Sequence, residues 1–311
     1  MSKSTQIELL LAKIESTYGE DANPTAALNA FKVANGQLTP LETETVALDY
    51  KKPTFGNNEQ IITGEQMKYS GEIYAAGSGT PGTAPPIGVL LRGCGWAETL
   101  TPDVSADYNP ISTGFESLTI YVYKDGILHK GTGCRGTVTA DFTAKQIPKF
   151  KFEFTGRFVP VVDAAMPDDA NYDGFITPKA AIPSYTGAIN LLGVANPKTR
   201  SFTLDTKTEV VKPEWVNYDE ISIVDRVPTG NAEVEMGSIA EHDWFDDVRS
   251  QKKGAVLYTH GIEPGNIVEV SYPSAMVSSP QYGDNQKTLT MQLTITPLIT
   301  NGNDDILLSF K

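Results

Sequence analysis

Alternating apolar and polar residues dominate the chain from residue 37 onward. In residues 117–123, leucine, isoleucine and valine alternate with threonine and tyrosine, and in residues 149–158 three phenylalanines alternate with lysine and glutamate. A period of two residues is typical of β-strands that bury one face. The Asp125-Gly126 pair favours a tight turn with positive φ angles, which predicts a hairpin after the first of these strands. We therefore expect a mainly β protein.

Helical patterns are few and short. Apolar residues at positions 7, 10, 11 and 14 share one helical face and precede Gly19, so they predict a short amphipathic helix or an arm within residues 1–36. A second short helix is predicted over residues 87–96, after a loop rich in glycine and proline.

An internal repeat is the most informative pattern. Residues 61–78 align without a gap on residues 221–238, at an offset of 160, and both segments end in Gly-Ser before a short candidate helix. The segment 163–183 between them is rich in Asp, Pro, Ala and Gly and has no sustained period, which is typical of a connection. The pattern favours a duplicated β unit with one helix in each copy.

Composition limits the function classes. The 311 residues include 25 basic and 38 acidic side chains, giving a formal net charge of -13, which disfavours tight binding to nucleic-acid phosphates. Most of the excess lies in the second half, where residues 161–311 carry 11 basic and 21 acidic side chains. No apolar run approaches the length of a membrane helix, and residues 1–18 do not have the pattern of a secretory signal.

Two loops carry patterns that could suggest ligand binding. Gly77, Gly79 and Gly82 have the spacing of a dinucleotide fingerprint, but the prolines that follow and the absence of a βαβ pattern favour a flexible loop. Asp169, Asn171 and Asp173 match the start of a calcium loop, but the closing glutamate is missing, so an acidic linker turn is favoured.

The remaining candidates for chemistry are isolated. The three histidines, at positions 129, 242 and 260, lack metal-ligand spacing. His242-Asp243 with Asp246-Asp247 is better explained as a carboxylate-rich first helical turn than as a metal site. Cys94 and Cys134 are predicted to be reduced thiols. We predict no catalytic, cofactor-binding or metal-binding residue, and no enzymatic activity.

Five stretches between about Leu11 and Pro160 carry a resemblance to a known family. In chain order they are KIESTYGEDANPTAALNA, ETVALDYKKPTFG, AAGSGTPGTAPPIGVLLRGCGW, YVYKDGILHKGTGCRGTV and IPKFKFEFTGRF. Together they resemble the tail tube proteins (major tail proteins) of long-tailed bacteriophages, most closely those with noncontractile tails. None of the five stretches is a catalytic motif.

The resemblance implies a structural virion protein of β-sandwich or barrel type. Subunits of such proteins form rings whose strands make a continuous inner barrel, and the rings stack into the hollow tail through which DNA passes into the host. The implied partners are further copies of the chain and the tape measure, tail terminator and baseplate or tip proteins; DNA crosses the lumen without specific binding. Assembly in the host cytoplasm and location in the virion tail follow.

Combined with the repeat, the resemblance predicts four segments: an N-terminal helix or arm (1–36), a first tail tube domain (37–162), a linker (163–186) and a second domain (187–311). Rings in this family usually contain six single-unit subunits, so a duplicated chain predicts a pseudo-sixfold homotrimer; an added external domain would leave six chains. The longer loop at residues 101–114, the N-terminal segment and the linker are candidates for contacts between rings.

The acid excess and the tryptophans each leave an alternative open. Acidic residues on matching strands, Glu42, Glu44, Asp205 and Glu209, are candidates to face a DNA-repelling lumen, although the charge could equally serve solubility. The alternative function is a soluble β-sandwich module that binds a ligand or carbohydrate or mediates adhesion, with Trp96, Trp215, Trp244 and the tyrosines as its platform.

Overall fold

The computed structural model describes residues 3–213 and 215–311, so that the first two residues of the predicted N-terminal segment lie outside the described residues. Strands dominate the chain, and its helices are short, which confirms the mainly β class. The helices are α1 (Ala26–Asn29), α2 (Gly88–Gly93), α3 (Trp244–Arg249) and the single 3-10 turn η1 (Pro183–Tyr185).

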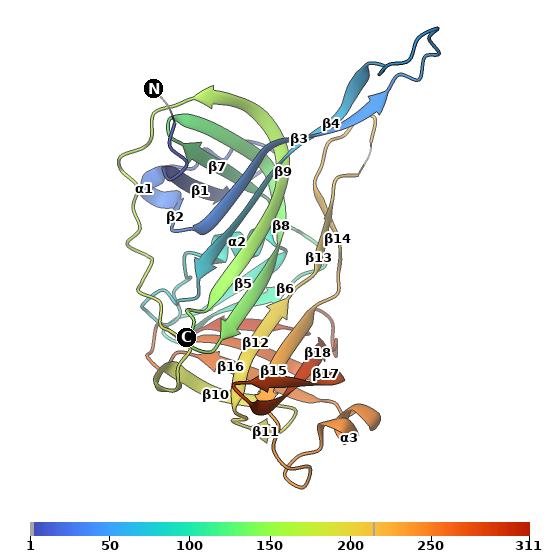
Figure 1. Cartoon of the computed structure of the whole chain (residues 1–311). Helices are drawn as coiled ribbons and strands as arrows, with labels where there is room; N and C mark the ends of the chain where they lie inside the picture. Colours follow the sequence, from blue (N-terminus) through green and yellow to red (C-terminus); the bar gives the residue numbers. More distant parts are fainter. Residues whose placement is uncertain (1–2, 214) are drawn as a thin grey trace.

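Two runs of four antiparallel strands form one side of the molecule (Figure 1). The first run has the order β3 (Ala34–Ala47), β4 (Gln60–Tyr74), β9 (Lys149–Asp163) and β8 (Ile127–Thr143). The second run has the order β12 (Thr199–Asp205), β15 (Thr229–Glu235), β18 (Thr288–Pro297) and β17 (Val268–Asn285).

A second layer covers one face of each run, and its pairings recur in the same order. In the first half, β8 pairs with β7 (Leu118–Lys124), which pairs with β1 (Glu8–Ile14), which pairs with β2 (Ala30–Phe31). In the second half, β17 pairs with β16 (Gly254–His260), which pairs with β10 (Thr186–Leu191), which pairs with β11 (Val194–Ala195).

The remaining strands connect the halves or extend from them. β6 (Ser105–Pro110) pairs with β5 (Trp96–Thr101) and with the C-terminal β19 (Leu307–Phe310), which also pairs with β17. A separate two-stranded ribbon consists of β13 (Thr208–Val211) and β14 (Ser222–Arg226).

The hydrophobic core runs through both halves as one cluster. Phe142 and Phe150 of the first half lie in the same cluster as Phe202 and Tyr258 of the second. The Tyr258 ring is 4.9 Å from the ring centroids of both Phe142 and Phe202. Because these aromatic rings are buried between the halves, the halves are held together by the same apolar burial that stabilises each of them.

The helix predicted from positions 7, 10, 11 and 14 is wrong, because residues 8–14 form β1. Leu10 and Ala12 pack into the main core, whereas Leu9 and Leu11 pack into a smaller cluster on the opposite face. A strand that is buried on both faces shows a continuous apolar run, which periodicity cannot distinguish from a short buried helix.

Three other local predictions are confirmed, whereas the loop expected at residues 101–114 contains β6 (Ser105–Pro110). β7 and β8 form a hairpin whose turn residues, Asp125 and Gly126, have φ angles of 43° and 83°. The two short helices fall where the sequence predicts them, α2 within residues 87–96 and α3 after Gly237-Ser238. Residues 164–182, between the end of β9 and the start of η1, have no helix or strand, as expected of a connection.

The strand pairings of the two halves recur, but their buried positions are displaced by one residue from the gapless alignment. Buried positions of β4, such as Tyr69 and Ile73, are odd-numbered, whereas those of β15, such as Ala232 and Val234, are even-numbered. The offset of 160 is therefore wrong for this strand, because side chains alternate between the faces of a sheet. An offset of 161 matches Ile73 to Val234, the last buried residue of each strand.

Candidate functional site

The two four-strand runs meet at an antiparallel junction between β8 and β12. Five residue pairs join them, from Ser201 opposite Thr143 to Asp205 opposite Thr139. The first run therefore continues into the second as one series of eight strands, β3–β4–β9–β8–β12–β15–β18–β17.

Both ends of this eight-strand series carry an open edge. Among the strand pairings of the described residues, β3 pairs with β4 alone. β17 pairs with β16 as far as Ala275, and in residues 276–285 its described pairings are to β18 only. An open strand edge presents unpaired N–H and C=O groups, which are suited to pairing with another chain.

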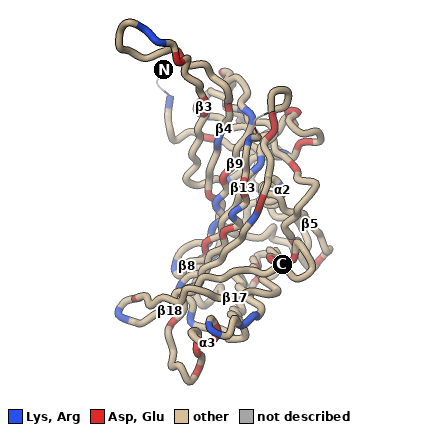
Figure 2. The backbone as a smooth tube through the Cα atoms, turned by 90° about the vertical axis from the view of Figure 1, so that its right-hand side faces the viewer, with Lys and Arg blue, Asp and Glu red and all other residues tan. Residues whose placement is uncertain are grey.

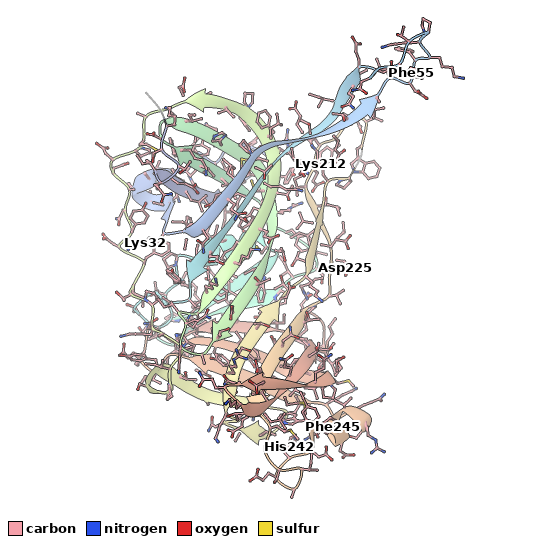
Figure 3. The ribbon with its side chains drawn as sticks, viewed as in Figure 1. Lys32, Phe55, Lys212, Asp225, His242 and Phe245 are labelled. Carbon is pink, nitrogen blue, oxygen red and sulfur yellow. The ribbon has the colours of Figure 1, made fainter. Side chains whose placement is uncertain are left out.

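A long hairpin arm extends from the first half. Its residues, 41–65, are the distal parts of β3 and β4 and the loop between them, and the arm projects away from the rest of the molecule (Figure 1). Figure 3 shows Phe55 at its far end. Six large apolar side chains of the arm are exposed: Leu41, Val46, Tyr50, Phe55, Ile61 and Ile62. An extended arm with this many exposed apolar side chains is typical of a surface that becomes buried against a partner.

An open groove lies between the base of the arm and the β13–β14 ribbon. Its volume is about 840 Å³, and Val46 and Ile62 of the arm face Trp215 and Tyr218 across it. Trp215 is 64% exposed and Val216 is fully exposed. The apolar surface of the arm therefore continues onto the segment between β13 and β14.

The segment before β14 is anchored on the first half by Arg135. The Arg135 guanidinium donates to the Ile221 carbonyl and to Glu220, at 2.6 and 2.9 Å, and lies over the Tyr18 ring. The Tyr18 hydroxyl accepts a hydrogen bond from the Ile221 N–H, and burial raises the pKa of Tyr18 to about 12. Lys212, near the base of the arm in Figure 3, donates to the Glu65 carbonyl at 2.7 Å.

A comparison with known protein families identifies the family of the chain that carries these open edges and the apolar arm. The family model described as "Phage tail tube protein" matches residues 5–310, nearly the whole chain. The chain belongs to the phage tail tube protein family. It is a structural component of the virion tail that self-assembles into a tube. No curated protein matches the chain.

In this tube subunit the glycine loop connects the two halves. The Gly79 N–H donates to the Gly265 carbonyl at 2.9 Å, and the Gly77 N–H donates to the Asn266 side chain at 3.1 Å. A Cβ atom on Gly77 would lie 2.1 Å from the Gly265 oxygen. The glycines therefore permit a close backbone approach, and this structural role explains their presence without a bound nucleotide.

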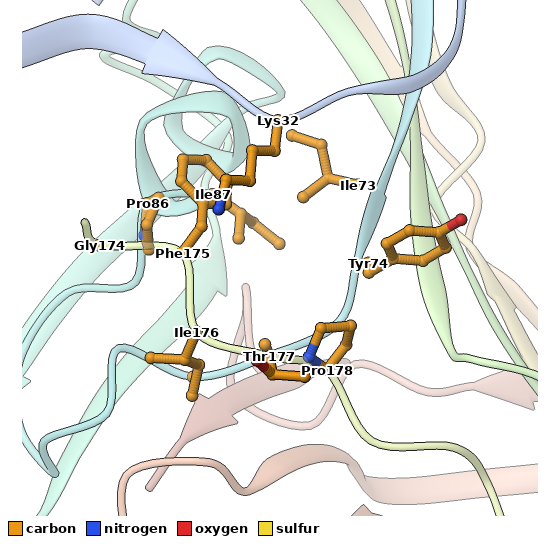
Figure 4. A pocket seen from close by; sticks show the side chains of 12 residues that line it. Lys32, Ile73, Tyr74, Pro86, Ile87, Gly174, Phe175, Ile176, Thr177 and Pro178 are labelled. Carbon is orange, nitrogen blue, oxygen red and sulfur yellow. The ribbon is translucent and has the colours of Figure 1, made fainter. Parts of the chain in front are cut away.

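The acidic connection lies over the first half. Its Tyr172 and Phe175 rings contact each other, and Phe175 also packs edge-to-face on Phe31. The Asn171 side chain accepts from the Asp173 N–H, as in a local turn. A cavity of about 190 Å³ beside it, lined by Lys32, Pro178 and apolar side chains, is shown in Figure 4. This volume is below the usual range of small-molecule sites.

His242 and the carboxylates beside it have structural partners. Asp243 caps α3 by accepting from the Phe245 and Asp246 N–H groups, which confirms the predicted acidic first turn. Asp247 forms an ion pair with Lys252 at 3.0 Å, and its carboxylate lies 2.7 Å from the His242 ring nitrogen. Within residues 3–213 and 215–311, no group of three or more His, Cys, Asp and Glu side chains is placed to hold a metal ion.

Both cysteines are free and buried, as predicted for reduced thiols. Burial raises the pKa of Cys94 and of Cys134. The described helices include none that is long and apolar enough to cross a membrane.

The tryptophans do not form a common platform. Trp96 and Trp244 are buried in the core, and Trp215 alone is exposed. The binding-module alternative thus loses two of the three tryptophans proposed for its platform. Trp215 belongs instead to the apolar groove at the base of the arm.

The four acidic lumen candidates lie in different surroundings. Glu42 forms an ion pair with Lys68 at 2.6 Å, and Asp205 accepts from the Lys207 N–H. Glu44 lines the groove beside the arm, and Glu209 is an exposed residue of β13. The sequence did not predict the arm's apolar surface or the open strand edges. Exposed apolar residues on a long hairpin have the same sequence pattern as buried strand residues.

Proposed function

We propose that three copies of this chain close head to tail into a pseudo-sixfold ring, and that stacked rings form the hollow, noncontractile tail tube through which DNA passes into the host. The observation that carries the proposal is the β8–β12 junction. This junction joins the two halves of one chain edge to edge, and we propose that the open edges join neighbouring chains in the same way. Assembly takes place in the host cytoplasm, with tape measure, terminator and tip proteins as partners.

The recurring pairings support duplication into two tail tube units, residues 37–162 joined by β1 and β2 of the N-terminal segment, and residues 187–311. β3 and β12 occupy equivalent positions, because each is the first strand of its run. β8 and β17 are likewise equivalent, because each is the last strand of its run. If the units are equivalent, β3 of one chain pairs with β17 of the next as β12 pairs with β8. Such a head-to-tail contact repeats and closes into a ring where its rotation allows. It also removes the open edges.

The junction specifies a register. Leu204 of β12 faces Gly230 of β15, and Leu38 of β3 faces Tyr69 of β4. Because Tyr69 matches Gly230 at the offset of 161, Leu38 takes the place of Leu204.

The partner position follows in the same way. Ala140 of β8 faces Phe150 of β9, and Tyr282 of β17 faces Met291 of β18. Phe150 lies opposite Ile73 of β4, and Met291 lies opposite Val234 of β15, which is the residue matched to Ile73. Tyr282 therefore takes the place of Ala140, and an interchain pair places Leu38 opposite Tyr282.

Disulfide crosslinking tests this arrangement. The neighbouring pair, Thr39 opposite Gln281, has exposed side chains. We expect the double variant Thr39→Cys/Gln281→Cys, assembled and oxidised, to give covalent species of up to three chains on a denaturing gel. The control Gln37→Cys/Gln281→Cys is displaced by two residues and should crosslink weakly. Efficient tubes without a crosslink, or a covalent series that continues to six chains, would contradict the proposed ring.

A further inference from the structure

The outward face of the eight-strand series is polar throughout its central part. The opposite face is covered by the second layer and the core. At alternate positions β8 presents Thr137, Thr139 and Thr143, β18 presents Gln292, Thr294 and Thr296, and the strands between them present Ser201, Thr203, Thr229 and Asn231. Short uncharged side chains of this kind hydrogen-bond to water and give a face with little apolar area for a protein partner.

Every lysine and arginine on this face has a carboxylate partner. The face includes six cationic side chains, drawn from β4, β8, β9 and β12, and each lies within 4 Å of an acidic group: Lys68 with Glu42, Arg135 with Glu220, Lys149 with Glu72, Lys151 with Glu153, Arg157 with Asp219, and Arg200 with Glu233. The interspersed cationic and acidic positions along β4, β9 and β13 are visible in Figure 2.

For two of these partners, Glu72 and Glu42, the contact with lysine favours the ionised form. The hydrogen bond from Lys149 lowers the pKa of Glu72, and the same contact raises the pKa of Lys149. The hydrogen bond from Lys68 likewise lowers the pKa of Glu42. Carboxylates Asp141 and Asp205 lie on the same face, where the described ion pairs give them no cationic partner.

In the ring proposed above, this face is the inner wall. The second layer covers the other face, so closure of the eight-strand series leaves the polar face toward the axis. A cation binds DNA by neutralising a phosphate and releasing its counterion. The charge of a cation is largely cancelled by a carboxylate a few ångströms away, so that such an ion pair attracts a passing phosphate only weakly.

We propose that this wall avoids adhesion to duplex DNA by local neutralisation: each cation on it is held by a carboxylate partner, and hydroxyl and amide side chains fill the rest. This inference rests on the proposed function. It differs from the hypothesis of a uniformly acidic lumen, because it assigns the effect to the paired carboxylates and not to net charge.

Two charge-matched double variants separate these explanations. Glu72→Gln/Glu153→Gln removes two negative charges and leaves Lys149 and Lys151 without ionised partners. Asp141→Asn/Asp205→Asn removes the same charge from the same face and releases no cation. The amide oxygen of each variant can still accept one hydrogen bond, so that Glu72→Gln loses one of the two that Glu72 accepts from Lys149 and Asn35. Surface ion pairs contribute little to stability, so both variants should fold.

The experiment assembles each tube in the presence of a short labelled DNA duplex and measures the duplex retained as salt is varied. We expect Glu72→Gln/Glu153→Gln tubes to retain DNA with an affinity that falls about twelvefold between 50 and 200 mM salt, as for two phosphate contacts. Wild-type and Asp141→Asn/Asp205→Asn tubes should retain little. Equal retention by both variants, or none by either, would overturn local neutralisation. Absence of tubes in the wild type would instead overturn the proposed function, and electron micrographs of each sample distinguish the two failures.

Discussion

Leu204 of β12 lies directly opposite Ala140 of β8, although the two residues belong to different halves of the chain. Both side chains are buried, at 3% and 2% exposure. The pair shows that a strand edge of this fold accepts a second unit in a defined register. It is therefore the structural template for the contact that we propose between chains.

Leu204→Ala should destabilise the subunit by about 2–5 kcal/mol, because it removes a buried side chain at the junction and leaves a cavity. Thr203→Ala, the neighbouring residue on the outward face, should change the free energy of unfolding by no more than about 0.5 kcal/mol. Denaturant titration of the two purified variants measures the difference. Equal effects would mean that the junction does not bury Leu204 as described.

Arg135→Ala should release the segment between β13 and β14 from the first half. The Arg135 side chain is largely buried, and its removal leaves the Ile221 carbonyl and Glu220 without their donor. A cost of about 2–4 kcal/mol is expected. Limited proteolysis should cut the variant within residues 208–226 faster than the wild type. Arg249→Ala in α3 is the control, and a cleavage rate like that of the control would contradict the anchoring role.

Stability should fall on mild acidification because of His260. Burial lowers the pKa of His260, so the folded state keeps this ring neutral at pH values where the unfolded chain protonates it. The unfolded state then binds more protons, and the free energy of unfolding decreases as pH falls below about 6.5. His260→Phe should reduce this pH dependence between pH 7.5 and 5.5. His129, whose pKa burial also lowers, should maintain part of it.

The same unfolding titrations at both pH values provide the check. If the wild type and His260→Phe lose the same stability on acidification, then protonation of His260 does not contribute. Overall stability of the variant can change without affecting this comparison, since the pH slope is measured within each protein.

Ile61→Ser/Ile62→Ser should impair tube formation and leave the fold of the subunit intact. Both side chains are more than half exposed on the arm, so the substitution costs the isolated chain little. In an assembly that buries the arm, the lost apolar contact weakens every interface. Sedimentation measures polymerisation, and Leu28→Ser, an exposed position on α1, is the control. Normal tubes from the arm variant would show that the arm contributes no assembly contact.

Local structure was accessible from the sequence wherever one face of a strand is buried. The phenylalanine alternation of β9 and the Asp125-Gly126 turn each specify their conformation within a few residues. The N-terminal strand was not accessible in this way, because Leu9 and Leu11 are buried against a different cluster from Leu10. Its periodicity disappears when both faces are covered.

Relationships between distant residues could not be predicted. The carboxylate partners of Lys149 and Arg135 are Glu72 and Glu220, which are far from them in the sequence. A count of charges in the sequence therefore gives the acid excess but not which cations are paired. The similarity between residues 61–78 and 221–238 could be seen in the sequence, but its low identity gives no means of locating a displacement of one residue. Burial on alternating faces corrects it.

The rotational symmetry of the assembled tube tests the central claim most directly. Purified protein should polymerise into hollow tubes, and averaged end-on electron micrographs or helical reconstruction should show three chains per ring, with β3 of each chain beside β17 of the next. Six chains per ring, or rings in which β3 and β17 remain unpaired, would contradict the account.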